Sequence, residues 1–502
     1  MNIDKKSCYT ALKSHDNRFD GRFFVGISST GIYCRPVCRV KTPLEKNCTF
    51  YPSAAAAEFA GYRPCLKCRP ELAPGYSSVD ATARLARKAA KIIDENRLIE
   101  SDMAELAATL GITDRHLRRV FAAEFGVSPV QYLQTCRLLL AKNLLTDTNL
   151  SVTKIAMSAG FGSIRRFNDL FKTQYKLTPS DLRKHGCDTT KSDHETITLQ
   201  LGYRPPYHWN RQIRFLADRA IPGVESVKNE TYRRTVALRH GNDTVFGWIS
   251  VSNLAEKNVL AVTLPHALLP VLPKVLTNVR HLFDLNCDPV EIDKTLEAMN
   301  EISPDMYVSG TRLPGCFDPF ETSVRAILGQ QITVKAAKTL AMRLAATFGK
   351  NIATPFEELN TIFPSPETLC AFRETIEDRP GALGIIKTRI RSIFALAEGM
   401  SRGEIDLSPQ ANHETAIQKL LAIPGIGPWT AQYIAMRTLA WPDAFPHTDY
   451  GVKKALDGFS EREILQHAEA WRPWRAYATI NLWNSLKDNA AGLVANNSSL
   501  IK

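Results

Sequence analysis

The chain has 502 residues, which is too long for one hydrophobic core, because single domains usually hold about 100–200 residues. Hydrophobic residues make up 44%, charged residues 23% and aromatic residues 9% of the chain, which excludes a collagen, a coiled-coil rod and a disordered polymer. The net charge of +12 lies almost wholly in residues 1–190, where 29 basic side chains stand against 18 acidic ones; this favours a polyanionic partner such as nucleic acid.

We expect no targeting segment in this chain. Its first residues carry no apolar stretch behind their charges, so we expect no secretory signal. No run reaches the about 18 apolar residues of a membrane span, and even residues 259–272 are interrupted by two prolines and a histidine. We therefore expect a cytoplasmic protein without membrane contact. In that reducing setting the eleven cysteines are not expected to form a disulfide scaffold.

Four of the cysteines stand in two close pairs near the N-terminus. Three residues separate Cys34 from Cys38, two separate Cys65 from Cys68, and 26 residues lie between the pairs. This spacing is typical of a tetrahedral Zn²⁺ site made of four thiolates. A structural staple is the commoner role of such a site, and activation of one thiolate is the other; the spacing alone leaves both open.

The residues around the two pairs, 30–39 and 62–70, resemble the N-terminal domain of the Ada-type methylphosphotriester repair proteins. The resemblance covers about residues 5–76, and we expect a zinc-binding domain over 1–76. It implies that Cys34 is a zinc ligand and also accepts a methyl group from a DNA phosphotriester. A zinc-bound thiol is deprotonated at neutral pH and is therefore a ready nucleophile. Basic side chains near the cysteines would hold the neighbouring phosphates: Arg35, Arg39, Lys41, Lys67 and Arg69.

Residues 77–187 predict helices, because they contain few glycines and carry apolar residues at intervals of three and four. A pattern repeats in them after about fifty residues: Leu106-Ala107, Gly111, Phe121, Phe125 and Pro129 return as Ile155-Ala156, Gly160, Phe171, Tyr175 and Pro179. Each copy predicts a helix-turn-helix, although a helical dimerisation module would show the same pattern. Basic side chains after each turn suit phosphates and base edges and favour DNA binding: Arg115, Arg118, Arg119, Arg165 and Arg166.

This helical segment resembles the paired helix-turn-helix domain of AraC-type transcription regulators. A zinc domain followed by this reader is the order found in Ada-type regulators. The resemblance implies binding to promoter DNA, a contact with RNA polymerase, and a rise in DNA affinity when methyl transfer removes negative charge from the thiolate centre. Ada-type proteins that repair O6-alkylguanine carry a Pro-Cys-His-Arg motif; this sequence has none, so we do not expect that activity.

A short polar segment, residues 187–194, precedes a change of pattern. Residues 197–201, 235–238 and 259–264 predict strands among helices, which gives a small α/β domain over 196–285. Residues 286–495 predict a further helical domain. The fold class we expect is therefore multidomain and mainly α: a small zinc-bound α+β domain, an all-α regulator, a small α/β domain and an all-α domain.

The last of these domains contains a glycine turn between two predicted helices, Pro424-Gly425-Ile426-Gly427. Gly425 and Gly427 leave backbone amides open to a phosphate, which favours a helix-hairpin-helix, although a plain helix-capping turn fits equally well. Twenty-two residues after Gly427 comes Asp449, ahead of another predicted helix. The commoner role of an aspartate in such a place is that of an N-cap.

Residues 197–495 resemble 3-methyladenine DNA glycosylase II, a member of the helix-hairpin-helix glycosylase superfamily, most clearly at 205–209, 282–285, 312–316, 325–330 and 471–475. The resemblance implies that Asp449 is the catalytic carboxylate. Five side chains would bind substrate: Trp429, Tyr433, Trp483, Gln330 and Gln331, the last in place of the family's common apolar wedge.

The same resemblance implies a monovalent cation at the hairpin, bound by the backbone carbonyls of Leu421, Ile423 and Gly425. Members that also cut the DNA strand place a lysine just after the hairpin. Trp429 occupies that position, so we expect a monofunctional glycosylase.

The chemistry agrees with this assignment. A purine alkylated at N3 or N7 is cationic and leaves readily, and aromatic faces hold such a base with about 1–3 kcal/mol of stacking energy. A carboxylate can stabilise the sugar cation and orient the attacking water. We therefore predict a methyl-accepting regulator fused to a glycosylase for 3-methyladenine and 7-methylguanine, acting on alkylated double-stranded DNA at the nucleoid of a bacterial cytoplasm. The alternative is a regulator whose second half is only a DNA-binding scaffold.

Overall fold

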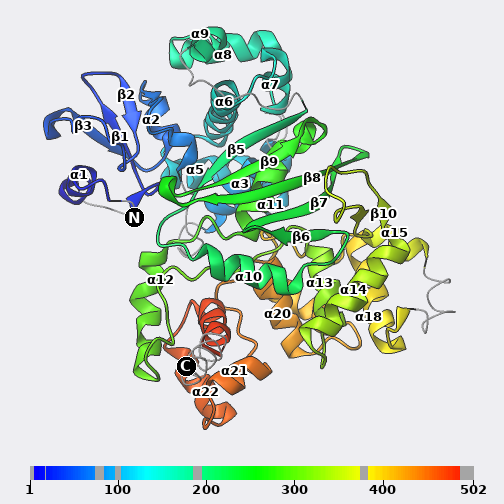
Figure 1. Ribbon diagram of the computed structural model, residues 1–502. Coiled ribbons are helices and arrows are strands. Elements are labelled where there is room, and N and C mark those ends of the chain that lie inside the picture. The colour runs from blue at the N-terminus through cyan, green and yellow to red at the C-terminus, as the bar shows by residue number, and fades with distance from the viewer. Residues whose placement is uncertain are drawn as a thin grey trace, which may run out of the picture. The chain divides into compact units, whose positions relative to one another are not determined.

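The computed structural model describes residues 5–16, 19–73, 84–96, 103–184, 195–372 and 383–486, and it is mainly helical (Figure 1). The chain forms two compact units. The first comprises Met1–Pro205, Val236–Arg280 and Leu285–Cys287; the second comprises Pro206–Thr235, His281–Asp284 and Asp288–Lys502. The expected multidomain, mainly α class is confirmed, and the four domain boundaries stay a prediction. Within the described ranges no helix has the length and apolar character of a membrane span.

The N-terminal part of the first unit is a small α+β structure. After helix α1 (Lys5–Lys13) comes a four-stranded sheet in the order β3-β1-β2-β4, with helix α2 (Ala54–Phe59) following β3. The strands are β1 (Phe24–Ile27), β2 (Ile32–Cys34), β3 (Cys48–Tyr51) and β4 (Arg63–Pro64). Strands β2 and β4 pair in parallel, with Tyr33 opposite Pro64. Because Cys34 and Cys65 each follow one of these partners, the parallel pairing brings the two cysteine pairs together.

The sequence repeat forms two helix-turn-helix units. In the first, α4 (Met103–Thr109) and α5 (Asp114–Phe125) flank Gly111, and in the second, α7 (Val152–Ser158) and α8 (Ile164–Tyr175) flank Gly160. Both glycines have positive φ, +69° and +89°, which a turn of this kind requires. The remaining helices are α3 (Arg84–Asn96), α6 (Pro129–Asp147), which joins the two copies, and α9 (Pro179–Lys184). The prediction of paired helix-turn-helix units is confirmed.

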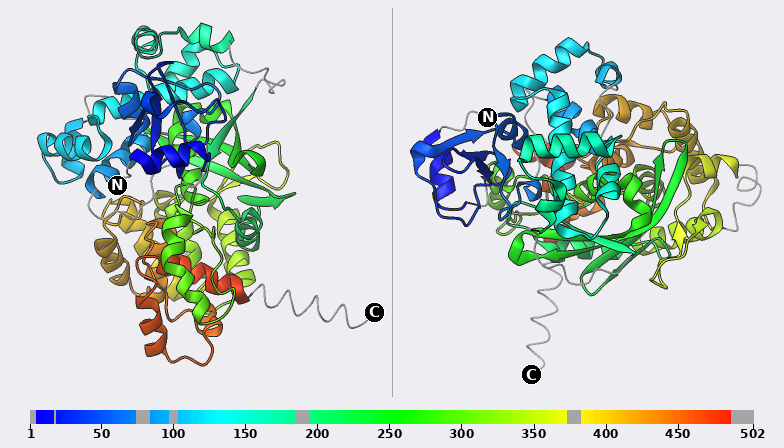
Figure 2. Two further views of the ribbon diagram at one scale, coloured as in Figure 1. Left: turned by 90° about the vertical axis from the view of Figure 1, so that its left-hand side faces the viewer. Right: turned by 90° about the horizontal axis from the view of Figure 1, so that it is seen from above.

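Helix α2 connects the small sheet to these helices, and the two parts lie side by side in every view (Figure 2). Ala55 and Ala56 belong to the buried cluster that contains Phe121 and Phe125. The Ser53 hydroxyl donates to the Phe125 carbonyl at 2.9 Å. The sheet and the reader helices therefore share one apolar core.

Glu58, near the end of α2, is a second link between these parts. Its carboxylate accepts hydrogen bonds from the hydroxyls of Tyr33, at 2.8 Å, and Tyr175, at 3.3 Å. Tyr33 precedes Cys34, and Tyr175 ends helix α8. The side chain is 2% exposed, and burial raises the pKa of Glu58 to about 8, which the hydroxyl of Tyr33 opposes only in part.

The second half of the chain contributes a five-stranded sheet in the order β5-β9-β8-β7-β6. The predicted strands appear as β5 (Thr196–Gly202), β7 (Thr231–His240) and β9 (Val259–Pro265), whereas β6 (Glu225–Lys228) and β8 (Asp243–Leu254) were not predicted. Strand β6 is short, and β8 contains Gly247, a residue that disfavours strands; an added Cβ there would lie 2.7 Å from the Leu268 side chain. The pairs β5–β9, β8–β9 and β6–β7 are antiparallel.

The second unit contains β6 and the start of β7; the rest is largely helical, as predicted for 286–495, with a further short pair of strands, β10 (Lys350–Asn351) and β11 (Thr361–Ile362). Helix α11 (Leu272–Leu282) leads into it from the first unit. Its helices include α10 (Trp209–Arg219), α12 (Pro289–Leu296), α13 (Pro319–Leu328), α14 (Val334–Phe348), α15 (Pro366–Ala371), α18 (Lys387–Ser401), α19 (His413–Leu421), α20 (Pro428–Thr438), α21 (Tyr450–Ala455) and α22 (Glu461–Glu469), and residues 475–486, which carry Trp483, are helical as well.

The protonation of Glu58 predicts a pH-dependent stability. The unfolded side chain releases its proton near the ordinary pKa of 4.5, and the folded one keeps it up to about 8. The free energy of unfolding should therefore fall as the pH rises through this window. Glu58→Gln carries no titrating group there. Measured by urea unfolding, its free energy of unfolding should therefore rise relative to that of the wild type by on the order of 4 kcal/mol between pH 5 and pH 9.

An exposed glutamate serves as the control for this measurement. Glu105, on α4, is exposed, so Glu105→Gln should follow the wild-type dependence on pH. Parallel curves for Glu58→Gln and the wild type would show that Glu58 does not hold its proton in the folded protein.

Candidate metal centre, DNA reader and carboxylate pocket

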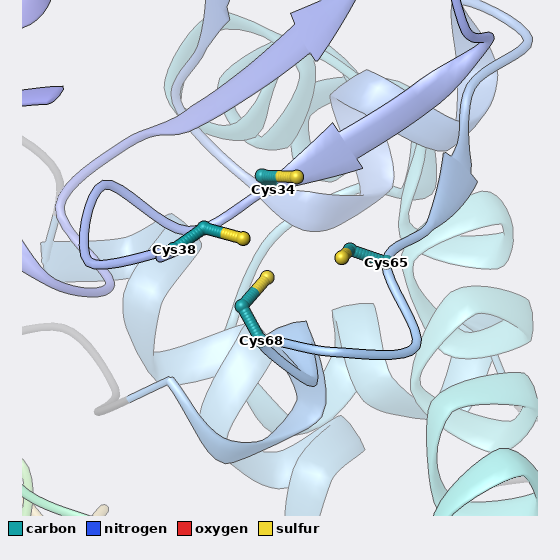
Figure 3. Close-up of side chains that lie close together, drawn as sticks. All are labelled: Cys34, Cys38, Cys65 and Cys68. Atoms are coloured by element: carbon teal, nitrogen blue, oxygen red, sulfur yellow. The ribbon is translucent and has the colours of Figure 1, made fainter. Parts of the chain in front are cut away.

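The four predicted metal ligands lie together in the first unit. The sulfur atoms of Cys34, Cys38, Cys65 and Cys68 are within 4.8 Å of one another. Figure 3 shows all four directed toward a common space. Three of the cysteines are buried and Cys68 is partly exposed.

The donor set fits a zinc ion. Hydrogen bonds among the four crowded sulfurs, together with burial, raise the pKa of the Cys34 thiol; burial, together with the same hydrogen bonds, raises the pKa of Cys68. These hydrogen bonds lower the pKa of the Cys38 and Cys65 thiols. The four thiols therefore cannot all lose their protons independently. A divalent cation among the four sulfurs would offset the repulsion between thiolates, and a thiol that ligates zinc is therefore deprotonated. Four thiolates around one centre are the ligand set of a closed, tetrahedral zinc site.

The basic residues around this centre fall into two groups. Arg39, Lys41 and Lys67 are exposed, as a phosphate contact requires. Arg35 is 8% exposed and pairs with Asp20, and Arg69 pairs with Glu71 and Asp147. For Arg35 and Arg69 the expected phosphate contact is therefore revised: both side chains are engaged inside the protein.

The reader helices present the basic residues that the sequence singled out. The side chains at the starts of α5 and α8 are exposed: Arg115, Arg118, Arg119, Arg165 and Arg166. On α5, Arg118 pairs with Asp114 at 2.8 Å and Arg119 contacts the His116 ring at 3.0 Å. Helix N-termini with exposed arginines suit the phosphates and base edges of the major groove.

Asp449 has the N-cap role that the sequence offered as one alternative, and its carboxylate also accepts hydrogen bonds from two indoles. It is the N-cap of α21, where one carboxylate oxygen, Oδ1, accepts from the amides of Gly451 and Val452 at 2.8 and 3.2 Å. The indole nitrogen of Trp483 donates to the same oxygen at 2.8 Å, and that of Trp429 donates to Oδ2 at 2.9 Å. The carboxylate is thus fixed by four neutral donors and is only partly buried.

Four aromatic rings cluster beside this carboxylate. Trp429 and Tyr433 stack with centroids 5.5 Å apart at 18°, and Tyr433 lies 6.2 Å from Trp483. The predicted aromatic set is therefore brought together. Phe215, from α10, was not predicted; its ring is 12° from parallel to Trp483 at 6.5 Å. In the sequence, Phe215 lies at an apolar position of an amphipathic helix, and such a position predicts only a core residue.

Two arginines support the rings from behind. The Arg219 guanidinium lies 3.8 Å from the Phe215 ring centroid, and that of Arg437 lies 4.9 Å from it. Arg437 also donates to the Tyr433 hydroxyl at 2.8 Å. Burial acts to raise the pKa of Tyr433, but Arg437 and Arg219 outweigh it and lower this pKa below its ordinary value. The sequence motifs singled out neither arginine.

Gly451 is another residue that the motifs missed. A Cβ placed on it would lie 2.7 Å from the Trp483 ring and 3.1 Å from Asp449 Oδ1. Only glycine leaves room for the indole to reach the carboxylate here.

The predicted hairpin joins α19 to α20. Gly425 has φ +90°, and an added Cβ would lie 2.5 Å from the Ser392 hydroxyl, so this position requires glycine. Gly427 is exposed and caps α20, with open space where a Cβ would be. The Gln330 amide donates to the Gly425 carbonyl at 2.8 Å, which ties it to the hairpin, whereas Gln331 is exposed with φ +54°.

Comparisons with known proteins agree with the three resemblances. The model of the metal binding domain of Ada matches residues 7–71, that of a helix-turn-helix domain matches 106–185, and that of the AlkA N-terminal domain matches 198–318. A probable bifunctional transcriptional activator/DNA repair enzyme AlkA of Mycobacterium tuberculosis is 36% identical over 499 residues, which cover 97% of each chain.

Two Escherichia coli proteins match separate parts of the chain. DNA-3-methyladenine glycosylase 2 is 34% identical over 283 residues, covering 56% of this chain and 95% of its own. The bifunctional transcriptional activator/DNA repair enzyme Ada is 32% identical over 210 residues, covering 40% of this chain and 56% of its own.

Metal removal should unfold the N-terminal sheet, because structural zinc contributes about 10–16 kcal/mol of apparent binding free energy to small domains. Stripping the full-length protein with a chelator should speed hydrogen exchange of the amides of β1 and β2 by orders of magnitude. Helix α13, in the second unit, is the internal reference. Unchanged exchange in β1 and β2 would show that the sheet is stable without a metal.

Proposed function

The chain belongs to the family of AlkA-type bifunctional transcriptional activators and DNA repair enzymes, and from this premise we propose that it both senses and repairs alkylated DNA. One half accepts methyl groups from backbone phosphotriesters and regulates transcription. The other half is a DNA-3-methyladenine glycosylase that releases alkylated purines.

Methyl acceptance is assigned to Cys34. Its thiolate attacks the methyl carbon of a methylphosphotriester, the new carbon–sulfur bond forms as the carbon–oxygen bond breaks, and the phosphate oxygen keeps the electron pair. A zinc ion bound by Cys34, Cys38, Cys65 and Cys68 would keep the four thiols deprotonated. The product is a thioether, so each protein molecule reacts once. Arg39 and Lys67, both exposed, would hold the neighbouring phosphates.

Transfer would act as a charge switch for the reader helices. A methylphosphotriester carries no charge, so a negative thiolate centre approaches it with less repulsion than any other phosphate. Once Cys34 is methylated the centre loses one negative charge, and affinity for promoter DNA rises. We infer that the exposed arginines of α5 and α8 then read the sequence and that RNA polymerase is recruited there, in the cytoplasm.

Base release is assigned to Asp449. The alkylated purine, already cationic, stacks among Trp429, Tyr433 and Trp483, and the carboxylate stabilises the sugar cation as the glycosidic bond breaks. The four donors on Asp449 are neutral, so they orient the carboxylate without cancelling its charge. Since the residue just after the hairpin is Trp429, we propose a monofunctional enzyme that leaves an abasic site.

The hairpin would anchor the DNA backbone. The amides at Gly425 and Gly427 would bind a phosphate, and the carbonyls of Leu421, Ile423 and Gly425 would bind a monovalent cation. The Ile423 and Gly425 carbonyls already accept from the Ile426 amide and the Gln330 side chain, so the cation would use their second lone pairs. Gln331, exposed beside the hairpin, would fill the space left by the extruded base.

The observation that carries the glycosylase proposal is the placement of Asp449 against two indole donors within a cluster of aromatic rings. Incubation of the full-length protein with methylated duplex DNA tests both halves, with free purines and methylated peptides scored by mass spectrometry. Cys34→Ala should lose the methylated peptide and keep purine release. Asp449→Asn should do the reverse. If the wild-type protein releases no alkylpurine, the glycosylase proposal is wrong and the alternative holds, in which the second half is only a DNA-binding scaffold.

A milder change tests how Asp449 is held. Trp483→Phe keeps a ring in the pocket but removes one donor to the carboxylate, and a hydrogen bond to a charged group contributes about 1.5–3 kcal/mol. Single-turnover base release should slow by about 10- to 100-fold. Trp441→Phe changes a tryptophan whose ring stacks on His413 and which is not among the four hydrogen-bond donors to Asp449; it is the matched control and should react at the wild-type rate. Equal rates for the two variants would mean that the indole N–H does not position the carboxylate.

A further inference from the structure

Arg35 lies between the cysteines of the first pair, yet its side chain is directed into the protein. The guanidinium donates from Nε to one oxygen of Asp20 at 2.8 Å and from Nη2 to the other. The side chain of Arg35 is 9% exposed and that of Asp20 is 4% exposed. Arg39, four residues further on, is exposed. Two arginines of the same short loop therefore face different surroundings.

The contacts of Arg35 join the two cysteine loops. Its backbone amide donates to the Cys68 sulfur at 3.4 Å, and its Nη1 donates to the Cys68 carbonyl at 3.1 Å. Its own carbonyl accepts from the Cys38 amide at 3.2 Å. One residue thus fixes the turn of the first pair and holds the last ligand of the second.

Asp20 completes this arrangement. A guanidinium bound by both oxygens of a carboxylate is held in one orientation, and a lysine in its place would lack the matching planar fork. Burying either charge alone would cost several kcal/mol, so the two residues act as a unit.

We propose that Asp20 and Arg35 are a positioning pair for the metal centre, and that Arg35 holds the Cys68 loop against the Cys34–Cys38 turn instead of contacting DNA. The inference rests on the proposed function of the four cysteines. Because the charges of the pair cancel, it adds no net positive charge beside the thiolates. The centre therefore keeps the negative charge that repels ordinary phosphates.

Zinc affinity of the full-length protein tests the pair, measured by competition with a coloured chelator. Asp20→Asn and Arg35→Gln should each weaken Zn²⁺ binding by about 10- to 100-fold, the usual effect of losing a group that orients a ligand. The double variant should lose no more than either single one, because the two act together. Additive losses, or wild-type affinity in both single variants, would overturn the proposal.

Two further readouts separate positioning from a general loss of stability. With Co²⁺ in place of zinc, the visible bands of the tetrahedral thiolate site should shift in both variants, whereas a merely destabilised protein would keep the wild-type spectrum in its folded fraction. Arg35→Lys, which keeps the charge but not the planar fork, should restore zinc affinity only in part.

DNA binding distinguishes the two arginines. For full-length protein on unmodified duplex DNA, Arg39→Met should lower the slope of log affinity against log salt by about 0.9, the effect of one lost phosphate contact, and leave zinc affinity unchanged. Arg35→Gln should leave the slope unchanged. A lower slope for Arg35→Gln with an unchanged slope for Arg39→Met would show that Arg35 contacts DNA. A wild-type protein that binds no zinc would instead refute the proposed function of the centre itself.

Discussion

A carboxylate that leaves water must find a cation or several hydrogen-bond donors, and this constraint organises both units of the protein. Asp20 meets it with Arg35, and Glu71 meets it with Lys142, at 2.6 Å between side chains that are 4% and 1% exposed. In the second unit Glu225 pairs with Arg325 at 2.7 Å. The last two pairs join residues 71 and 100 positions apart in the sequence, so these buried charges help to fix which segments pack together.

The reactive groups satisfy the same constraint differently. Asp20, Glu71 and Glu225 have their charge cancelled by arginine or lysine, whereas Asp449 is held by two indoles and two backbone amides, which are neutral. The thiolates of the metal centre likewise lie beside an arginine whose charge is already matched by Asp20. Both proposed chemistries need a negative charge that is oriented but not neutralised, and in both places the surrounding donors provide this.

Sequence reasoning succeeded where a short motif fixes the geometry and failed where the partner is distant. Some motifs determine the geometry of residues next to them in the sequence. They are the close cysteine pairs, the repeated turns at Gly111 and Gly160, and the hairpin. Phe215 and Asp449 lie on elements more than two hundred residues apart, and no local pattern connects them. Arg35 and Arg39 look alike in the sequence, and only the tertiary position of Asp20 separates a buried arginine from an exposed one.

Helix α2 belongs to the metal-binding domain by sequence and to the reader by packing, since Ala55 and Ala56 lie in the cluster of Phe121 and Phe125. A chain shortened to its first 76 residues would present this alanine face to solvent and deprive Glu58 of the Tyr175 hydroxyl. Recombination between related genes that separated the sensor from the reader would therefore break this shared apolar cluster.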